Sequence, residues 1–352
     1  MKSRRLNIRA ISSEIKVSTA TISRVLNNRP DVSPRTRQRV LSYLKKIGYH
    51  PRTLDDSLHL IGLVDTFSRH TLSSYYLSSI ADSFDRRVRS YGYNTMLLPS
   101  DQILRELHTH AHASILKRLD GILWMEPIFS KRFARILAEH KVPCVVINNC
   151  EDDVDIDVVE SDNRSASRQA VEFLLDKGHT AIGFVGGWLH LTNHKDRFDA
   201  YKERMAEAGI SIRDDWIIDD ITLWNDEGGN EGIHRLLGRS NRPSAVVLCS
   251  DYLAVGAYRA VRELGFSIPT DVSIVSFDDF PLAPYLDPPL TTFRQPLQEM
   301  GEIAATKLIG LITGERTPQS RHYLRCPLIV RKSAQTFQRA QGAGREEPKT
   351  QK

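Results

Sequence analysis

The 352-residue sequence predicts an α/β fold in two parts, a small three-helix head followed by a large body built on parallel sheets. Two observations lead to this prediction. Short helical patterns crowd into residues 1–50, and from Leu60 onward short apolar runs alternate with amphipathic segments. The composition, 41% hydrophobic and 26% charged, is that of a globular protein, and the length fits two or three domains.

Residues 1–50 are expected to form three short helices. The first follows isoleucines at helical spacing, and the second covers residues 19–26 after a capping Ser18 or Thr19. The third opens at Ser33-Pro34, because proline is favoured in a first turn, and ends at Gly48. The apolar side chains expected on these helices are Ile8, Ile11, Ile15, Ile22, Val25, Leu26, Val40, Leu41, Leu44 and Ile47.

Seven apolar runs in the body are expected to be strands, at residues 60–65, 94–99, 121–125, 143–148, 181–186, 244–249 and 272–277. Helical patterns lie near residues 74–90, 102–118, 131–140, 163–177, 197–208, 228–238, 252–264 and 297–313. Near-continuous Val, Ile and Leu runs separated by helices are typical of parallel sheets covered on both faces. We therefore expect two lobes within residues 60–333, with the chain switching lobes near 160 and 290. Ligands of such folds bind beyond the carboxyl ends of the strands, here between the lobes.

The charge is distributed unevenly along the chain. Residues 1–59 hold 13 Lys and Arg against 4 Asp and Glu, a net charge of +9, whereas the remainder holds 35 against 39, a net charge of −4. A basic head on a mildly acidic body indicates that the head meets a polyanion. The alternative is a solvated basic segment.

Other features exclude several classes of protein. No apolar run reaches the roughly 18 residues of a membrane span, and the basic N-terminus lacks the apolar stretch of a secretory signal. Four widely spaced cysteines without a CxxC pair predict reduced thiols in a cytoplasmic protein, not a zinc site or disulfides. Residues 334–352 have almost nothing to bury and are expected to be disordered.

The segment VSTATISRVLN, residues 17–27, has the pattern of a helix that enters the major groove of DNA. Such a helix needs short or polar side chains on its leading face, so that nothing holds it away from the base edges. Its leading face is expected to carry Ser18, Thr19, Ala20, Ser23, Arg24 and Asn27, with Ile22, Val25 and Leu26 packed behind.

NIRAISSEIKVSTATISRVLNNRPDVSPRTRQRVLSYLKKIGYHP (7–51) resembles the DNA-binding head of the lactose-repressor (LacI) family of bacterial regulators. The body continues the resemblance with SSYYLSSIADSFDRRVRSYGYN (73–94), LDGILW (119–124), VPCVVINN (142–149), VESDNRSASRQAVEFLLDKGHTAIGFVGG (159–187) and PTDVSIVSFDDFPLAPYLDPPLTTFRQP (269–296). The resemblance implies a helix-turn-helix head (1–50), a hinge (51–59) and a two-lobed, periplasmic-binding-protein-like body that binds an effector and dimerises.

The resemblance also implies roles for individual residues of the head. The base-reading positions are Thr19, Ala20 and Arg24, and the positions that contact phosphates or orient the backbone are Ser18, Thr21, Ser23, Asn27, Ser33 and Tyr49. The chain departs from the family at Lys16, in the turn, where glycine is usual. A lysine at this position needs a tolerable backbone angle.

The hinge leaves two interpretations open. Leu58 stands where family members insert a leucine into the minor groove. Asp55 and Asp56 either oppose the phosphates of that groove, or serve the first turn of a short helix capped by Thr53.

By the same resemblance, the residues expected to line the ligand cleft are Asp65, Thr66, Tyr75, Tyr76, Asn148, Arg197, Trp224, Ser250, Asp251, Asp278 and Gln295. Arg197 and Asp278 suit adjacent hydroxyls, and the tyrosines suit an apolar sugar face. Each has an ordinary alternative: a turn cap at Asp278-Asp279, packing at Tyr75 and Tyr76, or an exposed helix position at Arg197. Asn148-Asn149 and Ser250 depart from the family's frequent Asp-Arg and Asn.

The predicted function is that of a ligand-controlled transcriptional repressor. Its expected partners are a pseudo-palindromic operator in double-stranded DNA, a small effector such as a sugar, and a second copy of the chain. A solute-binding transport protein is the rival, and it would have no use for a basic helix-turn-helix.

No metal, cofactor, membrane contact or enzymatic activity is expected. His108 and His112 share a helix face without a further ligand, so a polar surface is favoured over a metal site. The acidic run EDDVDID (151–157) lacks the spacing of a calcium loop. The sequence contains no P-loop, and GFVGGW (183–188) is not a dinucleotide fingerprint.

Overall fold

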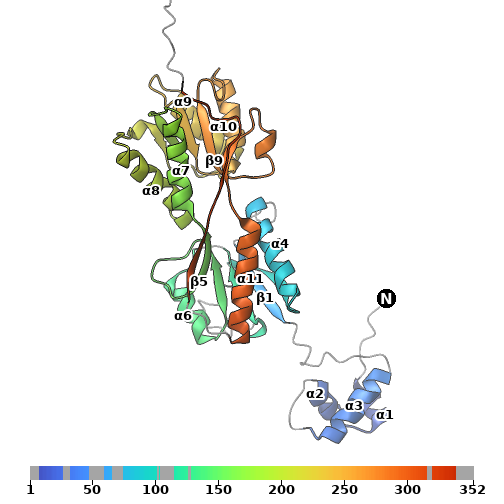
Figure 1. Ribbon diagram of the computed structural model, residues 1–352. Helices are drawn as coiled ribbons and strands as arrows, with labels where there is room; N and C mark the ends of the chain where they lie inside the picture. The colour runs from blue at the N-terminus through green and yellow to red at the C-terminus, as the bar shows by residue number, and fades with distance from the viewer. Residues whose placement is uncertain are drawn as a thin grey trace, which may run out of the picture. The chain divides into compact units, whose positions relative to one another are not determined.

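A computed structural model describes residues 8–26, 32–46, 59–65, 74–100, 103, 115–125, 128–314 and 319–337 (Figure 1). The chain divides into two units, Met1–Leu60 and Ile61–Lys352, and each is described by itself. Several predictions lie outside the described residues, namely those on Asn27, Tyr49, residues 51–58 with Leu58, Thr66, and residues 108–112.

The head consists of α1 (Ile8–Ile15), α2 (Thr19–Leu26) and α3 (Pro34–Lys46). These bounds agree with the helices expected from the sequence, except that Ile47 and the expected end of the third helix at Gly48 lie outside the described residues. One apolar cluster joins the three helices and contains Ile11, Ile15, Ile22, Val25, Val32, Val40 and Leu44. Because Ile22 and Val25 face this cluster, the opposite side of α2 is left at the surface.

Hydroxyl caps fix the starts of the second and third helices. The Ser18 hydroxyl accepts a hydrogen bond from the backbone N–H of Thr21 at 3.0 Å. Ser33 does the same for Thr36 at 3.3 Å. Each bond satisfies one of the backbone donors that a helix N-terminus leaves open.

The first sheet of the body has the strand order β11-β5-β4-β3-β1-β2. The strands are β1 (Leu60–Asp65), β2 (Asn94–Pro99), β3 (Gly121–Trp124), β4 (Cys144–Ile147), β5 (Asp157–Ser161) and β11 (Arg321–Leu324). The helices of this lobe are α4 (Tyr75–Arg89), α6 (Lys131–Glu139) and α11 (Leu297–Thr313), with a 3-10 turn, η2 (Leu116–Arg118). Figure 1 shows α11 beside α4, and the two helices pack together against β1, β3 and β4.

The second sheet has the order β12-β10-β9-β8-β6-β7. Its strands are β6 (Ile182–Val185), β7 (Ile217–Ile218), β8 (Ala245–Leu248), β9 (Ser273–Asp278), β10 (Thr291–Arg294) and β12 (Leu328–Ile329), with 3-10 turns η3 (Asp214–Trp216) and η4 (Ala283–Tyr285). Its helices are α7 (Asn163–Asp176), α8 (Thr192–Glu207), α9 (Asp226–Leu237) and α10 (Asp251–Glu263). One pair, α9 and α10, covers one face, and α7 and α8 cover the other. The predicted α/β fold with parallel sheets is confirmed; β12, which pairs antiparallel with β10, is the exception in this sheet.

The chain crosses between the lobes after β5, after β10, and a third time between β11 and β12. The third crossing was not among the two expected from the sequence. Hydrogen bonds tie the crossings together: the Asp162 N–H donates to the Leu324 carbonyl at 2.8 Å, and the Arg294 N–H to the Pro327 carbonyl at 2.9 Å. The Ser161 hydroxyl also donates to the side-chain oxygen of Gln295 at 2.8 Å.

Several boundaries differ from the sequence-based expectations. Helix α8 begins at Thr192 instead of 197, and within 102–118 the structure describes only residue 103 and the short turn from 115. The chain packs through Phe337, three residues beyond the expected start of the tail at 334, and the Phe337 N–H donates to the Lys177 carbonyl. Among the described helices, none is long and apolar enough to cross a membrane.

Lys16 adopts a left-handed backbone, with φ of +46°. This conformation costs a non-glycine residue roughly 1–2 kcal/mol, whereas glycine adds roughly 0.5–1 kcal/mol of unfolded-state entropy. We expect Lys16→Gly to stabilise the head by about 0.5 kcal/mol, which amide hydrogen exchange of α1 and α2 in the intact chain would measure. The control is Arg39→Gly, on the exposed face of α3, which should destabilise the head by about 1 kcal/mol. Faster exchange in the Lys16 variant would contradict the expectation.

Candidate functional site

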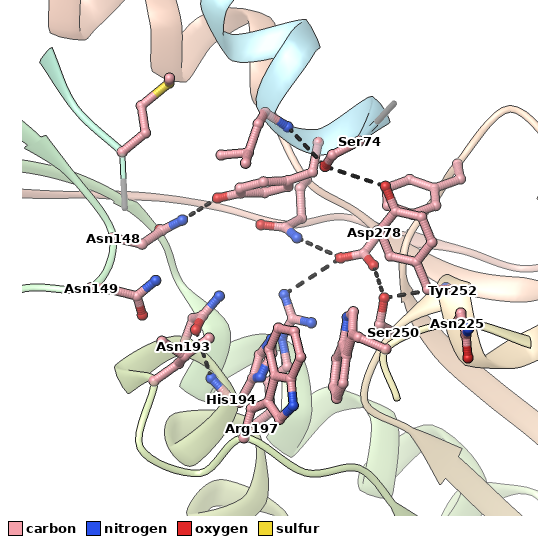
Figure 2. A pocket seen from close by; sticks show the side chains of 18 of the residues that line it. Ser74, Asn148, Asn149, Asn193, His194, Arg197, Asn225, Ser250, Tyr252 and Asp278 are labelled. Atoms are coloured by element: carbon pink, nitrogen blue, oxygen red, sulfur yellow. Dashed lines mark hydrogen bonds and ion pairs between the residues drawn. The ribbon is translucent and has the colours of Figure 1, made fainter. Parts of the chain in front are cut away.

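A cavity of about 430 Å³ lies between the two lobes of the body. Its walls come from segments that follow strands: Met125 follows β3, Asn148 follows β4, Ser250 follows β8, and Gln295 follows β10. The carboxyl ends of strands from both sheets therefore meet at the cavity, as expected for ligand sites of doubly wound folds. Figure 2 shows Asn148 and Asn149 on one side of the cavity and His194, Arg197 and Ser250 on the other.

Asp278, at the end of β9, is the centre of the polar network in the cavity (Figure 2). One carboxylate oxygen accepts from the Gln295 amide at 2.5 Å and lies 3.6 Å from the Arg197 guanidinium. The other accepts from the Ser250 hydroxyl at 2.5 Å and from the Asp251 N–H at 3.3 Å. Four protein donors thus surround one buried carboxylate.

Arg197 lies on α8 and is 2% exposed, so it is not the exposed helix residue considered as an alternative. Its guanidinium donates to the Asn163 side-chain oxygen at 2.8 Å and to the Cys249 carbonyl at 2.6 Å. It also lies over the ring of Phe277, 4.7 Å from the centroid. These contacts hold one nitrogen towards Asp278, the arrangement that a buried charge pair needs to offset its desolvation.

Burial raises the pKa of Asp278, and the positive charge of Arg197 counteracts the rise. Burial raises the pKa of Asp251 as well, and the nearby Asp278 carboxylate adds to that effect. Asp251 itself faces away from the cavity walls: its oxygens accept from the Thr292 hydroxyl at 2.8 Å and from the Phe280 N–H at 3.0 Å. It holds the loop after β9 in place.

Two sets of hydrogen bonds join the lobes across the cavity. The Tyr252 phenol, from the second lobe, donates to the Ser74 hydroxyl at 3.3 Å and accepts from the Tyr75 N–H at 3.2 Å. The Thr192 hydroxyl, also from the second lobe, donates to the Asn149 side-chain oxygen at 3.2 Å. Ser74 is also the N-cap of α4, so the Tyr252 bond reaches the first turn of that helix.

An aromatic stack forms part of the second lobe's wall. The His194 ring lies 4.3 Å from that of Trp224 at an angle of 15°, and the Trp188 ring lies 5.4 Å from Trp224 at 25°. The indole N–H of Trp188 donates to the Thr222 carbonyl at 3.1 Å. Trp188 is 38% exposed, so an apolar ring face remains available at the cavity.

His194 is neutral at physiological pH. Burial lowers its pKa from 6.5 to about 3, and the nearby charge of Arg197 adds to the shift, whereas a hydrogen bond to the Gly187 backbone opposes it. Within the described part of the chain, its Nδ1 atom is buried and has no hydrogen-bond partner. Such an atom costs roughly 1–3 kcal/mol until something binds it.

The backbone is unusual at four positions around the cavity. Asn148, Trp188, Asp278 and Asp279 have φ values of +53°, +52°, +120° and +53°. Residues other than glycine rarely adopt these conformations, and they cluster at ligand sites where the surrounding structure enforces them.

The structure places the residues predicted for the cleft in three groups. Seven line the cavity: Tyr76, Asn148, Arg197, Trp224, Ser250, Asp278 and Gln295. Asp65, Tyr75 and Asp251 do not, and Thr66 lies outside the described residues. Asp65 is buried at the end of β1, and Tyr75 packs edge-on against Phe280 with centroids 5.4 Å apart.

In each of two adjacent pairs, Tyr75-Tyr76 and Asp278-Asp279, one residue lines the cavity and the other has the structural role considered as the alternative. Tyr76 lines the cavity while Tyr75 is packing. Asp278 lines it while Asp279 forms structural ion pairs with Arg294 and Arg331, each at 2.6 Å.

Sequence reasoning missed several lining residues, among them Asn149, Trp188, Asn193, His194, Asn225 and Tyr252. The signal for Trp188 was its place in the loop directly after the β6 run, and the signal for His194 was its place in the first turn of the helix that follows that loop. Asn149 was noticed only as a departure from the family pattern.

On the head, the exposed side of α2 carries Ser18, Thr19, Ala20 and Arg24. Thr21 is half-buried, and its hydroxyl lies 2.8 Å from that of Ser18. Ser33 starts α3 as its cap. The Ser23 side chain, Asn27, Tyr49 and Leu58 lie outside what the structure describes.

Removing Arg197 should unfold the body more readily, because Asp278 would lose its only charged partner among the described residues. We expect Arg197→Ala to lower the free energy of unfolding by about 3–5 kcal/mol in urea titrations. The double variant Arg197→Met, Asp278→Asn should lose less than the sum of its single variants, because neither charge remains unpaired. A loss below 1 kcal/mol for Arg197→Ala would contradict the structural importance of the pair.

His194 should make stability fall in acid. The unfolded chain takes up this proton near pH 6.5, whereas the folded chain does so only near pH 3, so stability is lost as the pH falls below 6.5. Between pH 8 and pH 5 the wild type should lose about 2 kcal/mol more than His194→Phe. Urea titrations at the two pH values measure this, with His190→Phe, an exposed position in the loop before α8, as the variant that should follow the wild type. Equal losses in wild type and His194→Phe would disprove the buried neutral histidine.

Comparison with known proteins identifies both parts of the chain. Residues 7–52 match the family described as bacterial regulatory proteins, lacI family, and residues 171–334 match the periplasmic binding protein-like domain. The ribose operon repressor of Haemophilus influenzae is 32% identical over 303 residues, which are 84% of this chain and 89% of that protein.

Two further proteins match over almost their whole length. The HTH-type transcriptional repressor PurR of Pasteurella multocida is 28% identical, covering 94% of this chain and 98% of that protein. The structure of the transcriptional regulator CelR–cellobiose complex has a TM-score of 0.71 and 27% identity, and covers 94% of this chain and 100% of that one. This chain therefore belongs to the lacI family of bacterial regulatory proteins, DNA-binding transcriptional repressors whose action a ligand modulates.

Proposed function

We propose that the chain represses transcription in the cytoplasm as a homodimer on a pseudo-palindromic operator, and that a sugar in the body's cavity controls its operator affinity. The observation that carries the proposal is the position of the cavity, which receives residues from both lobes. A ligand held by both lobes favours one arrangement of the lobes over another. Its differential affinity then shifts the population that binds DNA.

The chemistry of the cavity supports a sugar. Amide and hydroxyl groups make up most of its polar lining, and an indole face lies beside them. Hydroxyl groups of a sugar both donate and accept, and the apolar face of its ring packs on aromatic side chains. Two of the similar proteins are connected with sugars by name: one represses the ribose operon, and the other was solved as a complex with cellobiose.

An exposed apolar patch on the second lobe supports the homodimer. Val255 on α10 is 37% exposed, and Leu282 and Tyr285 at η4 are 51% and 83% exposed. The Tyr258 hydroxyl on α10 donates to the carbonyl of Pro288, three residues after η4, at 2.9 Å and so ties α10 to the segment that follows η4. A twofold pair of chains carries two heads, which matches two half-sites of a palindromic operator.

The proposal includes no catalytic activity. In the part of the chain that the structure describes, the charged groups of the cavity, Arg197 and Asp278, are committed to each other and to neighbouring protein groups. A fixed, saturated pair of this kind suits recognition better than proton transfer.

Arg24 is expected to read bases, because it is the only long cationic side chain predicted on the leading face of α2, and it is exposed. Arg24→Ala should weaken binding to the preferred palindrome by about 1–3 kcal/mol and binding to a scrambled duplex much less. Fluorescence anisotropy of the intact chain would measure both, with a palindrome selected from random duplexes.

Arg39→Ala, an exposed arginine on α3, provides the matched control. A phosphate contact or a distant charge affects all sequences alike, so this variant should weaken both duplexes equally. If Arg24→Ala also weakens both equally, Arg24 contacts only phosphates and the base-reading assignment fails.

A further inference from the structure

We propose that the cavity selects an uncharged sugar over its phosphate ester, and that the buried Nδ1 atom of His194 accepts a hydrogen bond from a hydroxyl group of that sugar. This inference rests on the proposed function and names the ligand class of the same cavity. Three features of the described residues carry it: the charge of the walls, the hydrogen-bonding direction of their polar groups, and the position of His194.

The described walls of the cavity carry no net charge that would attract an anion. Among the described residues that line the cavity, Arg197 and Asp278 are the only ones with a full charge, and they oppose each other at 3.6 Å. Arg197 already donates to Asn163 and to the Cys249 carbonyl. A phosphate dianion buried here would lose its hydration without an uncommitted cation among the described lining residues, which is strongly unfavourable.

The asparagines of the cavity are oriented as donors. The side-chain oxygens of Asn149, Asn193 and Asn225 accept from Thr192, from the His194 N–H and from the Gly228 N–H, at 3.2, 3.0 and 3.1 Å. Each of these amides keeps its NH₂ group as the remaining polar end. The ligand must therefore supply acceptors to several neutral N–H donors.

His194 imposes the opposite requirement. Its ring is 7% exposed and held against Trp224, and its pKa is lowered to about 3, so the ring stays neutral. The hydrogen bond to the Gly187 backbone raises the pKa, as a bond from a ring N–H to a carbonyl does, and this leaves Nδ1 as a bare acceptor. The ligand must offer it a donor.

A hydroxyl group satisfies both requirements, because it donates and accepts. A phosphate dianion has acceptors only and cannot bond to Nδ1. The exposed face of Trp188 and the side chain of Leu223, 46% exposed, add an apolar surface beside these groups. A sugar ring, polar at its edge and apolar on its face, fits this combination.

Calorimetry on the intact chain tests the ligand class. The probes are neutral pentoses, hexoses and disaccharides, including ribose, glucose and cellobiose, together with ribose 5-phosphate, glucose 6-phosphate and adenosine. We expect at least one neutral sugar to bind, and its phosphate ester to bind at least tenfold more weakly. Tighter binding of a phosphate ester, binding of adenosine alone, or no binding by any neutral sugar would overturn the proposal.

Substitution of His194 tests the acceptor. His194→Phe keeps a planar ring against Trp224 but removes Nδ1, so affinity for the bound sugar should fall about tenfold. The melting temperature without ligand should change little, because the substitution removes a buried acceptor without a partner but also the ring N–H that bonds to the Gly187 backbone. His194→Gln, which retains a side-chain acceptor, should keep more affinity than His194→Phe.

The matched control is His190→Phe, at an exposed position in the loop before α8, which should bind the sugar as the wild type does. Unchanged affinity in His194→Phe, or a fall in affinity with an equal fall in the melting temperature, would show that His194 only supports the fold.

Operator binding measured with each probe separates this inference from the proposed function. A phosphate ester or adenosine that binds and changes operator affinity defeats the inference and leaves the proposed function standing. A neutral sugar that binds without changing operator affinity does the reverse.

Discussion

The buried pair of Arg197 and Asp278 is the interaction on which the second lobe and the cavity depend. Asp278 closes β9 in a left-handed conformation and collects donors from Gln295, Ser250 and the Asp251 backbone. Arg197 brings α8 to the same point and anchors it to the end of β8 through the Cys249 carbonyl. Without the guanidinium, four elements would converge on a buried charge with no counter-charge among the described residues, so the pair fixes the geometry around which the cavity forms.

The sequence pattern predicted a strand correctly where the residues of the strand itself are apolar enough to account for its burial. Six of the seven apolar runs became strands that lie inside a sheet and are buried almost throughout, so hydrophobic composition alone marks them. The seventh, β2, is an edge strand that buries little of its length. The strands β5 and β11 were not predicted, because they carry polar residues whose burial depends on partners far away in the sequence. Asp157 is buried by Lys307, at 2.8 Å and 150 residues away, and Glu160 lies 3.5 Å from Arg321. No local window contains those pairs.

The residues of the candidate site show the same difference between positions that local sequence predicts and positions that depend on distant partners. Residues directly after strands, such as Asn148, Ser250 and Asp278, could be placed at the cavity by motif, because strand ends have a fixed position in this fold. Tyr75 and Tyr76 could not be separated, since only the orientation of the first turn of α4 decides which one faces inward. The roles of Trp188 and His194 depend on a stack with Trp224, 30 residues and more away in the sequence, and no spacing rule predicts it.

The three hydrogen-bonded crossings determine how the body is able to move. A single connection between two rigid lobes would permit bending and twisting in every direction. Three adjacent connections, tied through Leu324, Pro327 and Gln295, restrict the relative motion of the lobes and favour a hinge rotation about the crossings. Because β1 follows the linker from the head directly in the sequence, a ligand that changes the angle between the lobes also turns the strand to which the head is connected.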